Sequence, residues 1–135
     1  MTLSESLAGL PAFFLYFALS LALLAVFLAV YVAITPYKEL SLIREGNAAA
    51  AATLSGVLVG FALPLGSAVA HSVSLLDMLV WAVVALIAQL VAYAAVRLAV
   101  PKVVQDVRDG QVASGVFLGS VAASVGILNA ASMTY

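Results

Sequence analysis

The sequence predicts an all-α integral membrane protein with four transmembrane helices, built as two helical hairpins that are parallel copies of one repeat. Three observations predict this fold. Apolar residues fill 66% of the 135 positions and charged residues only 8%, which is far outside the range of soluble domains. Four apolar runs each reach roughly the 20 residues that a helix needs to cross a bilayer. All five basic residues lie in two short stretches between those runs.

The first predicted helix covers residues 10–34 and, with a helix over residues 48–70, forms the first repeat, residues 10–71. A cleavable signal peptide is the alternative for this N-terminal run. The residues before the run hold Glu5 and no basic side chain, and the run is too long for the apolar core of a signal peptide. We therefore expect it to be the first membrane span.

The second repeat is expected over residues 75–135, with helices over residues 75–98 and 112–133. Residues 44–47 (Arg-Glu-Gly-Asn) and 108–111 (Arg-Asp-Gly-Gln) match in charge order and in the place of glycine, at an offset of 64 residues. Each repeat holds two spans, so the copies have the same orientation, related by an axis along the membrane normal. A chance alignment of two low-complexity helices is the alternative.

Small residues distinguish the second and fourth helices from the bulkier first and third. In lipid, helices associate where small side chains let their backbones approach closely, so we expect these two helices at the centre of the bundle. A second small-residue face on the fourth helix predicts contact with another subunit, and hence a homo-oligomer. The predicted packing positions are Gly56, Gly60, Gly115, Gly119, Ser120 and Ser124.

The basic residues indicate the orientation. Cytoplasmic loops are enriched in Lys and Arg, so we expect residues 35–47 and 99–111 in the cytoplasm and both termini on the periplasmic or external side. Neighbouring opposite charges predict solvated turns, in which Gly46 and Gly110 take a positive φ at the end of a short helix. A cytoplasmic protein partner that docks here would contact Lys38, Arg44 and Arg108.

Gln89 falls at the middle of the third helix, where an unpartnered amide is costly in hydrocarbon. Helical spacing aligns it with Tyr93 and Arg97 on one stripe. One interpretation is a polar route from the membrane centre to the cytoplasm. The other, which the usual role of intramembrane amides favours, is that Gln89 joins two helices while Arg97 extends to the interface.

Pro64 interrupts the second helix, because it lacks the donor that would bond the Gly60 carbonyl. Asn129 lies at nearly the same depth in the fourth helix. Paired helix breaks at corresponding positions of two repeats indicate a binding site in transporters. A structural kink, satisfied by the neighbouring Ser67, is the alternative.

His71 and Asp77 flank the predicted outer turn. Two ligands are too few for a structural metal site. Ser74 and Asp77 fit the N-terminal capping pattern of a helix, so we expect capping. His71 is a candidate external proton sensor, because an unperturbed histidine titrates at about pH 6.5.

No residue pattern predicts catalysis or cofactor binding. The sequence has no cysteine and one histidine, and it contains no phosphate-binding glycine loop, zinc-protease helix motif or nucleophile elbow. We therefore expect a non-enzymatic protein without a cofactor or metal, whose partners are membrane lipids and not nucleic acid.

Residues 43–50 (IREGNAAA), 60–77 (GFALPLGSAVAHSVSLLD) and 126–135 (GILNAASMTY) carry a family resemblance. They resemble the bacterial inner-membrane family described as domain of unknown function 350, the YjfL-like proteins, over essentially the whole chain. The resemblance implies four spans in two repeats, and it implies no reaction. Members often occur beside envelope-stress genes, which favours a membrane-maintenance role. By this resemblance the residues to mutate first are Pro64, His71, Asp77 and Asn129.

Together these features predict an oligomeric inner-membrane protein that acts in envelope maintenance through lipid or protein contacts. The alternative is a small oligomeric channel or transporter with a path lined by Gln89, Ser120, Ser124 and Asn129. Four spans are few for a pore within one subunit, so this alternative also requires several subunits.

Overall fold

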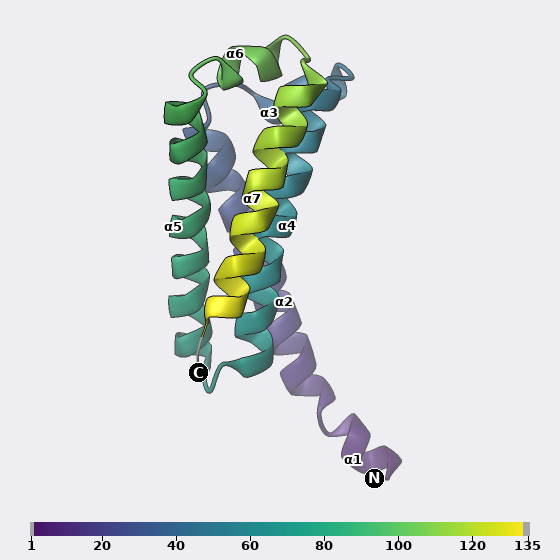
Figure 1. The fold of residues 1–135 in the computed structure, drawn as a ribbon. Helices are drawn as coiled ribbons and strands as arrows, with labels where there is room; N and C mark the ends of the chain where they lie inside the picture. The colour runs from purple at the N-terminus through teal and green to yellow at the C-terminus, as the bar shows by residue number, and fades with distance from the viewer. Residues whose placement is uncertain (1, 134–135) are drawn as a thin grey trace.

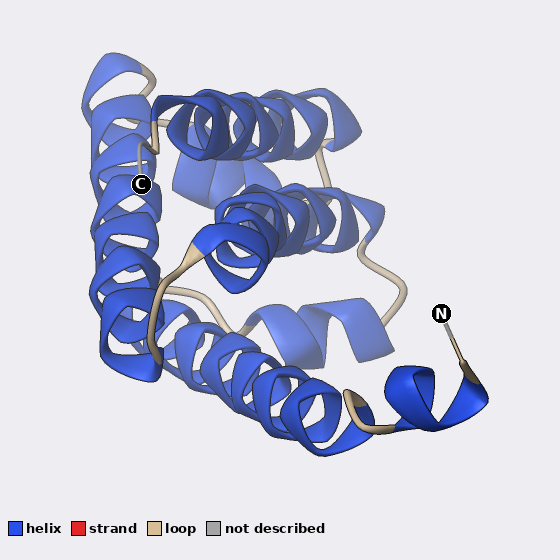
Figure 2. Ribbon diagram, turned by 90° about the horizontal axis from the view of Figure 1, so that it is seen from below, coloured by secondary structure: helices blue, strands red, loops and turns tan. Residues whose placement is uncertain are grey.

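The computed structural model describes residues 2–133, which form seven helices joined by loops and contain no strand (Figures 1 and 2). The helices are α1 (Leu3–Leu7), α2 (Leu10–Ile34), α3 (Glu39–Arg44), α4 (Ala48–His71), α5 (Leu75–Ala99), α6 (Val103–Arg108) and α7 (Val112–Ser132).

Helices α2, α4, α5 and α7 are long and apolar enough to cross a membrane, which confirms the predicted all-helical fold with four spans. Each predicted span begins and ends within one residue of one of these helices. The division into two hairpin repeats stays a prediction, and residues 134 and 135 of the second repeat lie outside the described residues. The structure adds α1, which Thr2 and Glu5 close through a capping box.

Helices α4 and α7 run parallel to each other and form the centre of the bundle (Figure 1). A Cβ atom added at any of five glycines would overlap the backbone of the other helix; at Gly56 it would meet the carbonyl of Gly119. We name this row of backbone contacts the glycine seam. It consists of Gly56 and Gly60 in α4, and of Gly115, Gly119 and Gly126 in α7.

Each glycine of the seam places its Cα against a carbonyl of the opposite helix. Gly56 faces the carbonyl of Gly119, and Gly126 faces the carbonyl of Gly60. Cα–H···O contacts recur at close helix–helix interfaces, and two touching backbones also gain dispersion energy. Lipid supplies no hydrophobic force between helices, so this close approach holds α4 and α7 together, with a hydrogen bond from the Thr53 hydroxyl to the Gly115 carbonyl at 3.2 Å.

Two predicted packing positions lie away from the seam. Ser120 and Ser124 are exposed on α7, and the Ser124 hydroxyl donates to the Ser120 carbonyl of the same helix at 2.8 Å. Successive residues of a helix are rotated by about 100°, so Ser120 does not share the direction of Gly119. The expectation that both serines pack at this crossing is therefore corrected, because Gly119 and Gly126 occupy it.

Helix α5 packs on both α4 and α7, and α2 covers α4 and α5. The C-terminal half of α2 makes this contact: Phe27 stacks on Phe61 of α4 with ring centroids 4.1 Å apart, and Tyr31 meets Tyr93 of α5. Towards its N-terminus, where α1 extends away from the bundle, α2 is exposed at side chains such as Phe13 (Figure 1). Helix α2 is therefore attached mainly through its C-terminal half, with Tyr16 and Leu19 of the other half packed only partly against the core.

Helices α3 and α6, with the loops at residues 35–47 and 99–111, lie at one end of the bundle, which we name the basic end (Figure 1). Gly46 and Gly110 end the two short helices with φ of 86° and 78°. This is the positive φ that the sequence predicts, and glycine takes it without steric cost.

Two side chains join the loops of the basic end. Asn47 accepts a hydrogen bond from the Ala50 amide at 3.0 Å, which caps α4, and its Nδ2 donates to the Val107 carbonyl of α6 at 2.8 Å. The Arg108 guanidinium donates to the Pro36 carbonyl. These hydrogen bonds join the loop after α2 to α6, and they join α6 to the start of α4.

The prediction of solvated turns at the basic end is wrong for part of these loops. Glu39, Val103 and Val107 are all fully buried. They are buried because α3 folds back onto α4, and α6 onto α7.

Replacing Gly56 by leucine is expected to disrupt the contact between α4 and α7. The new side chain would overlap the backbone of Gly119, which has no flexible side chain that could give way. We expect the free energy of unfolding to fall by about 2 to 3 kcal/mol, or folding to fail. Thermal unfolding of the purified protein in detergent measures this change.

Gly66→Ala is the matched control, because nothing lies within 4 Å of a Cβ atom at Gly66. Its free energy of unfolding should stay within about 1 kcal/mol of wild type. A Gly56→Leu protein with wild-type Tm would contradict the seam.

Candidate functional site

The basic end contains a group of buried polar side chains, which we name the tyrosine–carboxylate cluster. Its members come from the end of α2, the loop after it, the start of α3 and the last turns of α5. They are Tyr31, Thr35, Tyr37, Glu39 and Tyr93, and all five are buried.

Glu39 lies at the centre of this cluster. Proline disfavours a helical residue before it, so Pro36 ends α2 and turns the chain back, with Thr35 in an extended conformation. Glu39 then begins α3 with 0% of its surface exposed, and the Thr35 hydroxyl donates to its Oε1. Its second oxygen, Oε2, has no hydrogen-bond partner among the described residues.

Three tyrosines surround the carboxyl group. The rings of Tyr31 and Tyr93 pack edge to face with centroids 5.8 Å apart, and Tyr37 is buried against Val107 of α6. Within residues 2–133, the hydroxyls of Tyr31 and Tyr37 have no hydrogen-bond partner. Burial raises the pKa of Tyr37 above its ordinary value, with added effects of Tyr93 and Glu39, so this phenol is neutral at physiological pH.

Two guanidinium groups border the cluster. Arg97 is exposed on α5 beside Tyr93, and the exposed Arg108 is bonded to the Pro36 carbonyl. Burial raises the pKa of Glu39 to about 7, against the opposing effect of the hydrogen bond from Thr35. A guanidinium in direct contact would lower this pKa instead. The carboxyl group thus has the Thr35 hydroxyl as its hydrogen-bond partner, and burial outweighs this bond in setting its pKa.

Sequence reasoning missed Glu39, Thr35 and Tyr37 as site residues. The alternation of charges predicts an exposed pair of Lys38 and Glu39, whereas only Lys38 is exposed. The signal that could have found them is the run of polar and aromatic residues directly after an apolar span. Pro36 lies within this run and reverses the chain.

Gln89 links α5 to α7 at the centre of the bundle. Its Nε2 donates to the Ala122 carbonyl at 3.0 Å, next to Gly60 of the seam, and the side chain is 1% exposed. In the described part of the chain its Oε1 has no hydrogen-bond partner. The stripe continues through the buried Tyr93 to the exposed Arg97. Gln89 joins two helices here, and the polar route stays a prediction.

The prediction that Pro64 interrupts this helix is wrong, because α4 continues through Pro64 as one helix. Pro64 has no N–H to donate to the Gly60 carbonyl, and this carbonyl lies against Gly126 of α7. A glycine backbone therefore covers this carbonyl where lipid would leave it unsatisfied. Asn129 lies about one turn beyond Gly126, and its partly buried Nδ2 has no hydrogen-bond partner among residues 2–133.

His71 and Asp77 lie at helix ends on either side of the turn between α4 and α5. The His71 Nδ1 is 3.0 Å from the Ser67 carbonyl oxygen. The Asp77 amide donates to the Ser74 hydroxyl at 3.1 Å, and the Asp77 carboxylate accepts from the Val73 amide at 3.2 Å. The arrangement around Asp77 is the capping geometry that the sequence predicts.

The three predicted loop contacts differ in their surroundings. Lys38 and Arg44 are exposed at the basic end. Arg108 is also exposed, but its guanidinium is bonded to the Pro36 carbonyl and so joins the two loops.

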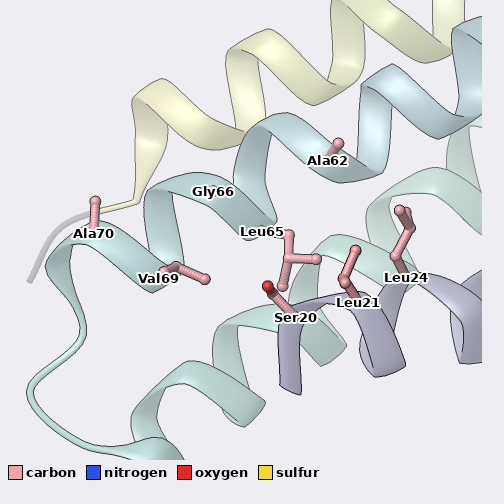
Figure 3. Close-up of a pocket in the computed structure, with 8 residues that line it drawn as sticks. All are labelled: Ser20, Leu21, Leu24, Ala62, Leu65, Gly66, Val69 and Ala70. Carbon is pink, nitrogen blue, oxygen red and sulfur yellow. The ribbon is translucent and has the colours of Figure 1, made fainter. Parts of the chain in front are cut away.

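A groove of about 300 Å³ opens between α2 and α4, and we name it the α2–α4 groove (Figure 3). Leu65 and Val69 of α4 point towards Ser20 and Leu21 of α2. The Ser20 hydroxyl donates to the Phe17 carbonyl of its own helix at 2.8 Å, so the walls are apolar. A second hollow of about 380 Å³ shares Ser20 and Val69 with this groove and continues along α2.

Comparison with known proteins shows the family. The family model described as Domain of Unknown Function (DUF350) matches residues 5–133. The chain belongs to this family. Two curated relatives, the UPF0719 inner membrane protein YjfL of Escherichia coli (strain K12) and that of Escherichia coli O157:H7, are each 40% identical over 129 residues, which cover 96% of this chain and 98% of the relative. No solved structure matches the chain.

The family resemblance drawn from the sequence is thereby confirmed. The relatives' names and the four apolar helices fit a multi-pass protein of the inner membrane.

Replacing Gln89 by leucine is expected to lower the free energy of unfolding by less than about 1 kcal/mol. Leucine nearly conserves the buried volume, and the Ala122 carbonyl lies within α7, where it keeps its helical partner. Gln89→Ala should cost about 2 to 4 kcal/mol, because it leaves a cavity. Unfolding of both variants in detergent, followed by tryptophan fluorescence, compares them. Equal losses in the two variants would show that the amide, and not its volume, holds α5 to α7.

Proposed function

We propose that the protein is a non-enzymatic component of the bacterial inner membrane, which acts in envelope maintenance as a homo-oligomer through contacts with lipids. The observation that carries this proposal is the α2–α4 groove. Its two walls belong to helices long enough to span the membrane, so its opening faces the acyl chains of the bilayer.

A lipid chain in this groove is favoured by packing. Acyl chains are as apolar as leucine, so burying one gains no hydrophobic energy within a bilayer. An empty groove, however, leaves the exposed Leu21 and the partly buried Val69 without contacts on one side, and their dispersion energy is lost. An acyl chain lying between α2 and α4 restores these contacts.

The basic end supports an orientation with α3 and α6 in the cytoplasm. Positively charged loops are retained on that side of the inner membrane. Lys38 and Arg44 are exposed there, at the level where anionic headgroups attract basic side chains. The same exposed charges would serve a cytoplasmic protein partner.

Two exposed surfaces support assembly into a homo-oligomer. The N-terminal half of α2 exposes Phe13, Phe14 and Phe17, while α7 exposes a face with Ser120 and Ser124. A small oligomeric channel or transporter is the alternative function, and the two exposed serines favour it, because a path between subunits needs polar groups on an outer face. Gln89 and Asn129 do not lie on that face. Ion flux in liposomes that a Ser120→Val/Ser124→Val variant loses would favour the channel, with Gln89→Leu/Asn129→Leu as the control away from that face.

Filling the α2–α4 groove is expected to displace bound lipid. Gly66 lines the groove, and nothing lies within 4 Å of a Cβ atom there, so the leucine side chain of Gly66→Leu has room to fill part of it. We therefore expect fewer lipids to remain with the purified protein after detergent washing. Native mass spectrometry counts the retained lipids.

Two controls separate the groove from general effects. Gly66→Ala makes the same backbone change without filling the groove, and Ala25→Leu adds leucine to an exposed position of α2 outside it. Both should retain lipid as wild type does. If Gly66→Leu also retains it, the groove is not the lipid contact.

The orientation is testable because the chain has no cysteine. A membrane-impermeant thiol reagent applied to intact spheroplasts should label Val73→Cys, in the turn between α4 and α5, and not Glu45→Cys at the basic end. Permeabilised spheroplasts should show labelling of both. Labelling of Glu45→Cys alone in intact spheroplasts would reverse the proposed orientation.

A further inference from the structure

We propose that Glu39 is a proton-binding site, and that loss of its proton releases α3 and the connection before it from their contacts with α4 and α6. The proposal is independent of the lipid-contact function. It rests on a fully buried carboxyl group whose immediate partner is a hydroxyl and whose second oxygen has no hydrogen-bond partner in the described residues.

The surroundings of Glu39 favour the neutral form. An ionised carboxylate out of water needs a countercharge or several donors. The titratable and charged groups that face Glu39 from the packed elements are Tyr31 of α2, Tyr37 of the loop, Tyr93 and Arg97 of α5, and Arg108 of α6. The phenols are neutral donors without a bond to the carboxyl group, and both arginines are exposed at the border.

The hydrogen bonds of Thr35 also favour a bound proton. The Thr35 hydroxyl has one hydrogen, and it lies beside Glu39 Oε1, 3.2 Å from the Tyr31 carbonyl oxygen and 3.3 Å from the Val32 carbonyl oxygen. The Tyr31 carbonyl already accepts from the Thr35 amide at 3.0 Å, whereas Pro36 has no N–H to donate to the Val32 carbonyl. With an ionised carboxylate, the hydroxyl serves Glu39 and not Val32. With a protonated carboxyl group, Glu39 donates to Thr35 and Thr35 donates to the Val32 carbonyl, so both bonds form.

Release of the proton leaves a negative charge on the buried Glu39 carboxylate. The ionised carboxylate must gain water or a guanidinium, and the nearby Arg108 is already bonded to the Pro36 carbonyl. Either change opens the contact between the loop after α2 and α6. Because burial raises the pKa of Glu39 to about 7, the exchange falls near neutral pH. The native state holds this proton more tightly than the unfolded chain, so stability is greatest below the ordinary pKa of 4.5 and declines as pH rises towards 7.

The test is a pH titration of the full chain in lipid nanodiscs. An environment-sensitive fluorophore on Glu45→Cys reports on the end of α3. Between about pH 5 and pH 9 we expect a one-proton transition with a midpoint near 7. Glu39→Gln, a neutral isostere, should show the low-pH signal throughout. Asp109→Asn, an exposed acid of the basic end, and His71→Gln, at the other end, should keep the transition.

A second measurement needs no variant at Glu39. Infrared difference spectra of the cysteine-free wild type should lose the band of a protonated carboxyl group with the same midpoint. A flat response in both measurements, or a transition that persists in Glu39→Gln, overturns the proposal. A midpoint that moves when sodium replaces potassium in the buffer would assign the site to a metal cation and also overturn it.

Discussion

The direct contact of two backbones, along the glycine seam between α4 and α7, is the constraint on which the rest of the structure depends. Lipid does not push helices together, so the bundle needs one pair that gains enough from close packing and from the hydrogen bond that it permits between Thr53 and Gly115. Helix α5 lies against this pair, and α2 lies against α4 and α5. The seam also explains Pro64, because the carbonyl that this proline leaves without a donor is covered by Gly126.

The features that could be predicted from sequence have local causes. The spans follow from the length of apolar runs, the turns at Gly46 and Gly110 from the conformational freedom of glycine, and the start of α5 from the side chains of Ser74 and Asp77. Pairing of the two small-residue helices was also predictable. Which small residues meet was not, because several faces of α7 carry them and only tertiary packing selects the face with Gly119 and Gly126.

The geometry of the tyrosine–carboxylate cluster and of the α2–α4 groove could not be predicted, because each depends on how separate elements lie in space. A glutamate directly after Lys38, in a short charged connection between two spans, has the local pattern of an exposed residue. Its burial comes from the reversal at Pro36, which sets Glu39 against Thr35, and from the rings of Tyr31 and Tyr93, which belong to different helices. The groove depends on how α2 leaves the bundle, and no sequence pattern records that path.

The uneven attachment of α2 would allow the protein to respond to bilayer thickness. With 25 residues α2 is about 37 Å long, and α7, with 21, is about 31 Å, against a hydrocarbon core of about 30 Å. A helix longer than the core tilts to keep its apolar surface covered. Since α2 is held near Phe27 and Tyr31, its tilt moves the opposite half, which forms one wall of the groove. A change in membrane thickness that tilts α2 would therefore change the groove's width more than it changes the glycine seam.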